Sequence, residues 1–253
     1  MSIVTKPVVR LQNLTWPAAD EALRQRPVGL LPIGAIEAHG PHLPLDTDII
    51  IAEATAERAA GRLEESGVPV IILPPIAYTV SFAGTSFAGT TPVEADQFEA
   101  YLASLLGQAA RQGYRALICC NAHLEPEHVA RVQHACLIAE EQSGVPTRAP
   151  DQRSDAHASR LSEEFRRGAR HAGGYETSIL LAVRPDVVDV EQMRALPPVW
   201  IDLPARLRAG ARTFADAGAD LGYFGDPARA TAEEGHAMLD ALADIIIGAI
   251  PWH

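Results

Sequence analysis

The chain has 253 residues, of which 47% are apolar and 21% charged. This composition is typical of a soluble globular protein and is compatible with one large domain over residues 1–253. The formal net charge of −11 argues against nucleic acid and anionic membranes as partners, because both require a basic surface. The first residues lack the apolar core of a secretory signal, and no run approaches the roughly 18 apolar residues of a membrane span. Cys119, Cys120 and Cys136 are an odd number, two of them in an apolar run, which favours buried thiols over disulfides and predicts a cytoplasmic protein.

The first predicted elements alternate between strands and helices. An apolar run over residues 28–33 predicts a strand, residues 49–65 a helix that ends before Gly67, and residues 68–73 a second strand. Residues 74–91 then form a long loop rich in Gly, Ser and Thr. Loops of this length in compact domains usually carry function or are mobile.

The next helix has a recognisable start. Thr91 at the N-cap, Pro92 at the first helical position and Glu94 at the third form a capping box, which predicts a helix to about Gln112. The elements that we expect after it are a strand, a helix, the start of a strand, an amphipathic helix and a buried helix, over residues 115–120, 126–142, 145–147, 154–169 and 174–183. Thr231 is predicted to cap a last helix that ends near residue 250, with Glu234 at its third position. Strands that alternate with helices predict an α/β fold with a mainly parallel sheet covered on both faces.

Two short segments each carry a carboxylate and an imidazole two residues apart. Glu37 and His39 follow the first strand, and His123 and Glu125 follow the third. Residues i and i+2 of extended backbone point to the same side, and sites in parallel sheets form at the carboxyl ends of the strands. Asp48 lies nine residues after His39. Together these five side chains are enough to hold a pair of divalent metal ions.

The types of ligand indicate the chemistry of such a site. Carboxylates and neutral imidazoles without thiolates suit catalytic zinc or manganese better than a structural zinc site. A carboxylate such as Asp48 can bridge two ions ~3.5–4 Å apart, which can hold a hydroxide and polarise a carbonyl. The pattern therefore predicts a metallohydrolase.

His171 and Glu176 form a further candidate pair around a Gly-Gly step. An imidazole near the metals could carry a proton to a leaving nitrogen. Alternatively, His171 is an ordinary loop residue and Glu176 complements the dipole of the following helix. His42 is expected to make a structural hydrogen bond, and His128 to face solvent or pack locally. No G-x-G-x-x-G follows a strand, so a NAD-binding domain is disfavoured.

Several motifs in this chain resemble those of the creatininase (creatinine amidohydrolase) family. The segment from Glu37 to Asp48, EAHGPHLPLDTD, resembles the family signature E-x-H-G-P-H-L-P…D. The other matching segments are Gly89-Thr90-Thr91, Asn121-Ala122-His123-Leu124-Glu125, residues 171–178 (HAGGYETS) and Gly225-Asp226-Pro227 with Ala230-Thr231. The resemblance covers roughly residues 25–240 in the family's order.

This resemblance implies a three-layer α/β/α sandwich, two metal ions per chain and a homo-oligomer, commonly a hexamer. Glu37 and His123 would serve one ion and His39 the other, with Asp48 and Glu125 at or between them. His171 would be the acid/base residue. Glu176 would be its partner near the site, and Glu125 would act in catalysis as well as in metal binding.

The function implied is metal-dependent hydrolysis of a non-peptide C–N bond in a small molecule, such as a cyclic amide, a lactam or a formamide. A peptide-trimming hydrolase and a non-catalytic metal-binding subunit are the alternatives. Creatininases enclose creatinine with tryptophans between the second ligand pair and the His-Ala-Gly motif, a segment that contains no tryptophan here. We therefore expect a substrate other than creatinine, contacted by Ser81, Leu124 and Tyr175.

Overall fold

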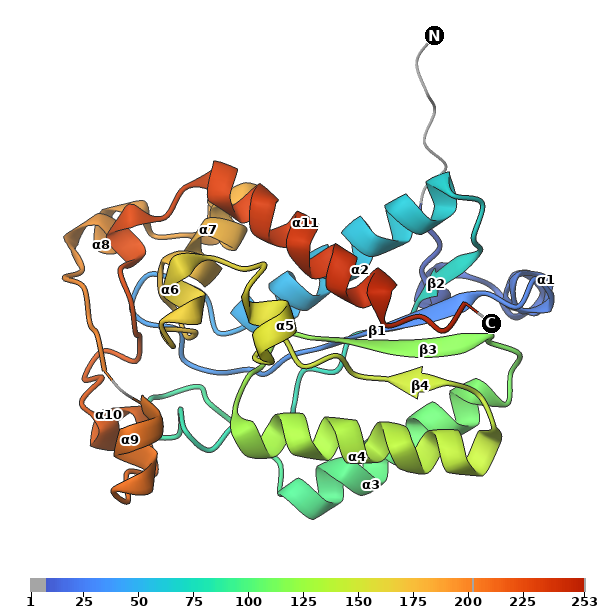
Figure 1. Ribbon diagram of the computed structural model, residues 1–253, viewed down its shortest axis with the longest axis horizontal. Helices are drawn as coiled ribbons and strands as arrows, with labels where there is room; N and C mark the ends of the chain where they lie inside the picture. Colours follow the sequence, from blue (N-terminus) through green and yellow to red (C-terminus); the bar gives the residue numbers. More distant parts are fainter. Residues whose placement is uncertain (1–7, 202, 253) are drawn as a thin grey trace, which may run out of the picture.

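A four-stranded parallel sheet with the strand order β2-β1-β3-β4 forms the centre of the molecule (Figure 1). The computed structural model describes residues 8–201 and 203–252. The strands are β1 Val28–Ile33, β2 Val70–Ile72, β3 Ala116–Asn121 and β4 Thr147–Arg148. The chain passes from β1 to β2 on one side and later to β3 on the other, which makes the gap between the ends of β1 and β3 a topological switch point.

Long helices cover both faces of this sheet, so the predicted three-layer α/β/α sandwich is confirmed. On one side lie α3 and α4, and on the other α2 and α11 (Figure 1). Their bounds are α2 Thr47–Glu65, α3 Ala95–Ala110, α4 Pro126–Ser143 and α11 Ala232–Gly248. Alternate strand residues enter different cores: Leu31 and Cys119 pack with α3 and α4, whereas Leu30 and Cys120 pack with α2 and α11. The period of two along a strand explains this division.

The remaining helices are shorter, and most of them gather beyond the carboxyl ends of the strands (Figure 1). They are α1 Trp16–Arg24, α5 Asp155–Ala158, α6 Glu163–Arg166, α7 Gly174–Val183, α8 Val190–Ala195, α9 Leu203–Arg208 and α10 Phe214–Ala217. Single 3₁₀ turns occur at Leu11–Asn13, Pro185–Val187 and Pro227–Arg229. In the part of the chain that the structure describes, no helix is both long and apolar enough to cross a membrane.

The capping box predicted at Thr91 is wrong. Helix α3 begins at Ala95, after Glu94, and has no side-chain cap. The preceding backbone is instead bound to neighbouring segments, with Thr91 N donating to Ile36 O (3.4 Å) and Val93 N to Thr79 O (2.8 Å). These long-range hydrogen bonds hold the segment outside the helix.

The helix predicted over residues 154–169 is also wrong, because two one-turn helices, α5 and α6, take its place. Ser162 interrupts the pattern, since its side chain accepts a hydrogen bond from Phe165 N (3.1 Å) and starts α6 as a new helix. A further difference concerns α2, which begins at Thr47 and so places Asp48 in a first helical turn rather than in a loop. The cap at Thr231 is confirmed by its hydrogen bond from Glu234 N (3.2 Å).

Helix α11 approaches α7 closely enough that one contact requires glycine. A Cβ atom on Gly235 would lie 1.9 Å from the Ser178 carbonyl oxygen. We expect Gly235→Ala to lower the free energy of unfolding by about 1–3 kcal/mol or more, because both partners are backbone or packed helix and cannot move aside cheaply.

Urea unfolding of Gly235→Ala beside Gly61→Ala checks this expectation. Gly61 lies in α2, and an added Cβ there meets nothing within 4 Å, so this control should lose no stability and gain up to about 1 kcal/mol from helix propensity. Equal stabilities of the two variants would contradict the proposed contact.

Candidate metal centre

Five acidic and imidazole side chains from four elements converge at the switch point between β1 and β3. Glu37 and His39 lie on the segment after β1, and His123 lies directly after β3. Asp48 comes from the first turn of α2 and Glu176 from the first turn of α7. All five are buried.

The first of the two groups around Asp48 contains Glu37, Asp48 and His123. The His123 Nδ1 atom lies 3.2 Å from Glu37 Oε2 and 3.0 Å from Asp48 Oδ2. One ligand atom from each of the three residues lies within 4.8 Å of the others. Three N and O donors at this spacing can surround one cation.

The second group contains His39, Asp48 and Glu176. The His39 Nε2 atom lies 3.3 Å from Asp48 Oδ1 and 3.7 Å from Glu176 Oε2, and the three ligand atoms again lie within 4.8 Å of one another. Asp48 is thus common to both groups and offers one oxygen to each.

Backbone carbonyls fix which ring nitrogen of each histidine is free. The His39 Nδ1–H donates to Glu37 O (2.9 Å), and the His123 Nε2–H donates to Val80 O (3.0 Å). The other nitrogen of each ring, His39 Nε2 or His123 Nδ1, therefore faces the carboxylates, where it would offer its lone pair to a metal ion. Such a hydrogen bond behind a ligating imidazole is the usual arrangement at a metal ion.

The carboxylates of the cluster have only imidazoles, and no lysine or arginine, as positive partners in the described chain. Glu37, Asp48 and Glu176 are buried, and among the described residues none of them pairs with a lysine or arginine. Both Glu37 carboxylate oxygens, Asp48 Oδ2 and His39 Nε2 make no hydrogen bond there. Burial alone would lower the pKa of His39, but the carboxylates led by Asp48 raise it to about 10. Buried charges need partners, and these N and O donors fit zinc or manganese.

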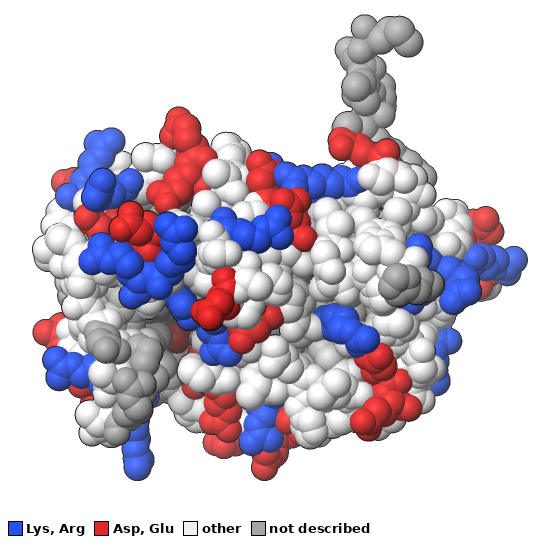
Figure 2. Space-filling model, in the orientation of Figure 1, with Lys and Arg blue, Asp and Glu red and all other residues white. Residues whose placement is uncertain are grey.

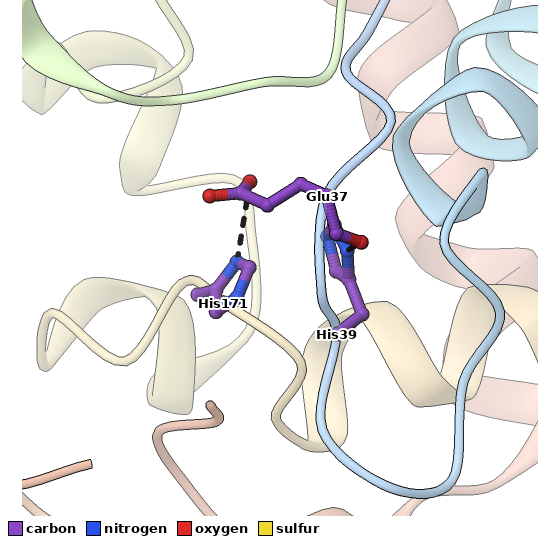
Figure 3. A group of neighbouring side chains, drawn as sticks. All are labelled: Glu37, His39 and His171. Carbon is purple, nitrogen blue, oxygen red and sulfur yellow. Dashed lines mark hydrogen bonds and ion pairs between the residues drawn. The ribbon is translucent and has the colours of Figure 1, made fainter. Parts of the chain in front are cut away.

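His171 lies beside this cluster, as predicted from its position before the Gly-Gly step. Figure 3 shows its ring and the Glu37 carboxylate pointing toward each other, with His171 Nδ1 4.0 Å from Glu37 Oε2. Its Nε2–H donates to Ala38 O (2.9 Å), which leaves Nδ1 as a free acceptor. Burial, followed by the charge of His39, lowers the pKa of His171 to about 4, so the ring is neutral near pH 7. These atoms with His39 make a third group of possible ligands, which overlaps the other two.

The spacing of residues in the sequence did not show which of Glu125 and Glu176 belongs to the groups of ligands, and the structure separates the two. Glu125 belongs to neither group around Asp48: its Oε2 accepts a hydrogen bond from Ala83 N (3.1 Å) and lies 3.9 Å from His123 Nε2. Burial raises the pKa of its carboxyl above the ordinary value. Glu176, which we predicted beside the metals as a catalytic partner, instead lies inside the second group.

A pocket of about 680 Å³ opens onto the cluster. Of the three residues predicted to contact substrate, Leu124 lines it. Tyr175 is buried, with its ring against Phe165 (4.9 Å between centroids) and its hydroxyl donating to Gln152 Oε1 (3.5 Å). Ser81 is buried and does not belong to the pocket lining of the described chain.

The sequence reading assigned several other residues differently or not at all. His42 makes the structural hydrogen bond that we expected, between Nε2 and Thr177 Oγ1 (2.9 Å). His128 packs locally and is fully buried rather than exposed, with its ring 4.8 Å from that of His123. Arg153 and Arg170 line the pocket and were missed, because both lie in irregular segments and Arg170 falls just before the segment 171–178 rather than within it.

The chain is similar to several known proteins. The family model for creatininase (creatinine amidohydrolase) matches residues 12–250. The mycofactocin precursor peptide peptidase of Mycobacterium ulcerans (strain Agy99) is 32% identical over 242 residues, which cover 93% of this chain and 85% of that protein. The creatinine amidohydrolase of Pseudomonas putida is 27% identical over 202 residues, covering 74% of this chain and 76% of that protein.

The fold is also that of solved creatininases. A manganese creatininase structure superposes with a TM-score of 0.72 and 24% identity over 96% of this chain and 97% of the other. The likeness shows the shared architecture, and the match of the family model over residues 12–250 covers every residue of the two groups around Asp48. The chain therefore belongs to the creatininase family of metal-dependent hydrolases.

Proposed function

We propose that this protein hydrolyses an amide C–N bond with two divalent metal ions held around Asp48. The observation that carries the proposal is the sharing of Asp48 between two buried groups of ligands, Glu37–Asp48–His123 and His39–Asp48–Glu176. A carboxylate that offers one oxygen to each group is suited to bridge two ions. In this assignment Glu176 takes the ligand position that we first gave to Glu125.

The donor set supports zinc or manganese as the ions. Solved creatininases that this chain resembles include a manganese and a zinc–zinc form. When bound, two such ions would polarise a substrate carbonyl and make water a nucleophile at neutral pH. The remaining steps fall to side chains of the pocket.

Two side chains are placed to move protons. Glu125 lines the pocket outside both groups around Asp48, and its raised pKa suits a carboxylate that takes a proton from the attacking water. His171 keeps an unprotonated Nδ1 at the edge of the cluster. We assign to this atom a relay: it would accept the proton that Glu125 takes from water and pass it to the leaving nitrogen, which returns both side chains to their starting states.

The substrate that we propose is a peptide rather than a small cyclic amide. The sequence alone favoured a non-peptide C–N bond and kept peptide trimming as an alternative. A relative that acts on a precursor peptide is 32% identical to this chain, against 27% for the creatinine amidohydrolase. In the described chain no tryptophan lines the pocket. A small amide or lactam remains the second candidate, because the same metal chemistry would cleave it.

We expect gently purified protein to contain about two zinc or manganese ions per chain by elemental analysis, because two groups of ligands share Asp48. Removing the ions with a chelator should lower the melting temperature, since ligands that bind only the folded state stabilise it. Restoring either metal should reverse the change. One ion per chain at saturation, or none, would contradict the shared site.

The function itself is tested by a hydrolysis screen with the metal-loaded protein. The panel contains short peptides, lactams and formamides, each incubated with and without chelator. We expect metal-dependent release of a new amine from at least one peptide. Cleavage of lactams or formamides alone would favour the second candidate, and no cleavage of any member would exclude amide hydrolysis.

A further inference from the structure

The wall of the pocket carries positive charge that the hydrolytic chemistry does not use. Arg153, Arg170 and Arg212 all line it, together with the acidic residues Glu125, Glu127 and Asp151 outside the two groups around Asp48. Figure 2 shows basic side chains gathered over α6, with acidic side chains among them. In a protein with a net charge of −11, an arginine of this pocket that has no acidic partner would indicate an anionic ligand.

Arg170 is held in place while its hydrogen-bonding end stays free. Its Nε–H donates to Phe165 O (3.1 Å), and its guanidinium lies 4.7 Å from the centre of the Phe165 ring. Both contacts fix a side chain that is half-buried. Throughout the described chain, no carboxylate pairs with this guanidinium and its two terminal nitrogens make no hydrogen bond. These nitrogens are the pair that binds a carboxylate in a forked arrangement.

The neighbouring acidic groups do not neutralise Arg170. Asp151 binds Arg153 through both of its carboxylate oxygens, each at 2.9 Å. Glu127 pairs with Arg131 at 3.4 Å. Burial, followed by the charge of Arg153, lowers the pKa of Arg170, and the opposing effect of Asp151 offsets this only in part.

We propose that Arg170 binds a carboxylate of the substrate, so that the protein selects acidic substrates whose carboxylate enters the same pocket as the scissile amide. The inference rests on the proposed function and adds a substrate class to it. A carboxyl-terminal carboxylate and an acidic side chain offer the same chemistry. In either case the charge pair would orient the amide toward the cluster around Asp48.

Calorimetric titration of the metal-loaded Glu125→Gln protein with three small peptides tests the proposal. The probes are N-acetylated tri-alanine with a free carboxylate, its neutral carboxamide, and a carboxamide with glutamate in the middle position. We expect at least one acidic probe to bind about tenfold or more tightly than the neutral one, as for charge-assisted hydrogen bonds. The preferred acidic probe identifies the source of the carboxylate.

Arg170→Gln in the same background should abolish the preference and leave the affinity for the neutral probe unchanged within about twofold. If the carboxylate of the probe bound a metal ion directly, the preference would remain in Arg170→Gln. The variant therefore distinguishes binding to Arg170 from binding to metal. Arg170→Lys keeps the charge but loses the forked pair of nitrogens, so it should retain part of the preference for acidic probes. A preference retained in this variant also shows that a substitution at this position leaves the protein folded. The control is Arg194→Gln on α8, where the side chain is exposed and outside the pocket.

Equal binding of acidic and neutral probes, or an equal loss for both in Arg170→Gln, would overturn the proposal. The experiments distinguish a failure of this proposal from a failure of the proposed function. An Arg170-dependent preference without hydrolysis in the substrate screen would exclude the amide hydrolase and leave the carboxylate site. Hydrolysis without any preference for acidic probes would support the amide hydrolase and exclude the carboxylate site.

Discussion

Replacing Asp48 by asparagine is expected to remove both metal ions and to lower the hydrolytic rate by about three orders of magnitude or more. Asp48 supplies one oxygen to each of the two groups, to His123 at 3.0 Å and to His39 at 3.3 Å. Asparagine keeps the shape but loses the charge and one acceptor oxygen. Ions that polarise a carbonyl contribute several kcal/mol to stabilising the transition state, and each 1.36 kcal/mol corresponds to a tenfold change in rate.

A closely matched control is Asp96→Asn. Asp96 is the second residue of α3, as Asp48 is of α2, but its side chain is 89% exposed and pairs with Arg131. This variant should keep its metal and its activity within about twofold, because exposed ion pairs contribute little. Elemental analysis and initial rates, measured side by side, give the answer. Two ions still bound to Asp48→Asn would show that the groups do not depend on the shared carboxylate.

Replacing Glu125 by glutamine is expected to reduce turnover by about 10²–10⁴-fold, the range for loss of a general base, and to leave both ions in place. Glu125 lies outside both groups around Asp48, and the amide oxygen of glutamine can still accept the hydrogen bond from Ala83 N. The fold should therefore be unchanged by circular dichroism.

The control for this variant is Glu141→Gln, an exposed glutamate on α4 outside the pocket, which should retain full activity. Metal content decides between the two roles that we have given to Glu125. Loss of an ion together with activity would return Glu125 to the ligand set that the sequence suggested. Full activity with both ions present would rule out a catalytic role.

The metal cluster and the rim of its pocket come from different parts of the chain. The ligands lie on the ends of β1 and β3 and on the first turns of α2 and α7, which are anchored in the cores around the sheet. The rim includes Arg153, Arg170 and Phe214, from short helices and irregular segments. A rigid centre with a separately built rim allows the rim to select a different substrate without disturbing the metals.

Much of this architecture was predictable because it depends on local pattern. Continuous apolar runs predicted the strands β1 and β3, and the spacing of Glu37 with His39 predicted side chains that leave a strand end together. Helix starts were less certain: Thr231 caps α11 as expected, whereas the equivalent pattern at Thr91 is overridden by hydrogen bonds to Ile36 and Thr79. A local capping pattern does not start a helix where backbone from distant segments forms hydrogen bonds with the same residues.

The sequence by itself determined the fold class, the two ligand segments and the kind of chemistry, since each is encoded within a few consecutive residues. Only the tertiary structure decided how the ligands divide between two groups. Glu176 joins His39 because α7 packs against α2, from which it is more than 100 residues apart in the chain, and against α11. It also decided that Arg170 keeps a free guanidinium, because Asp151 is already bound to Arg153. Such choices depend on packing and charge balance across the whole molecule, which no local pattern contains.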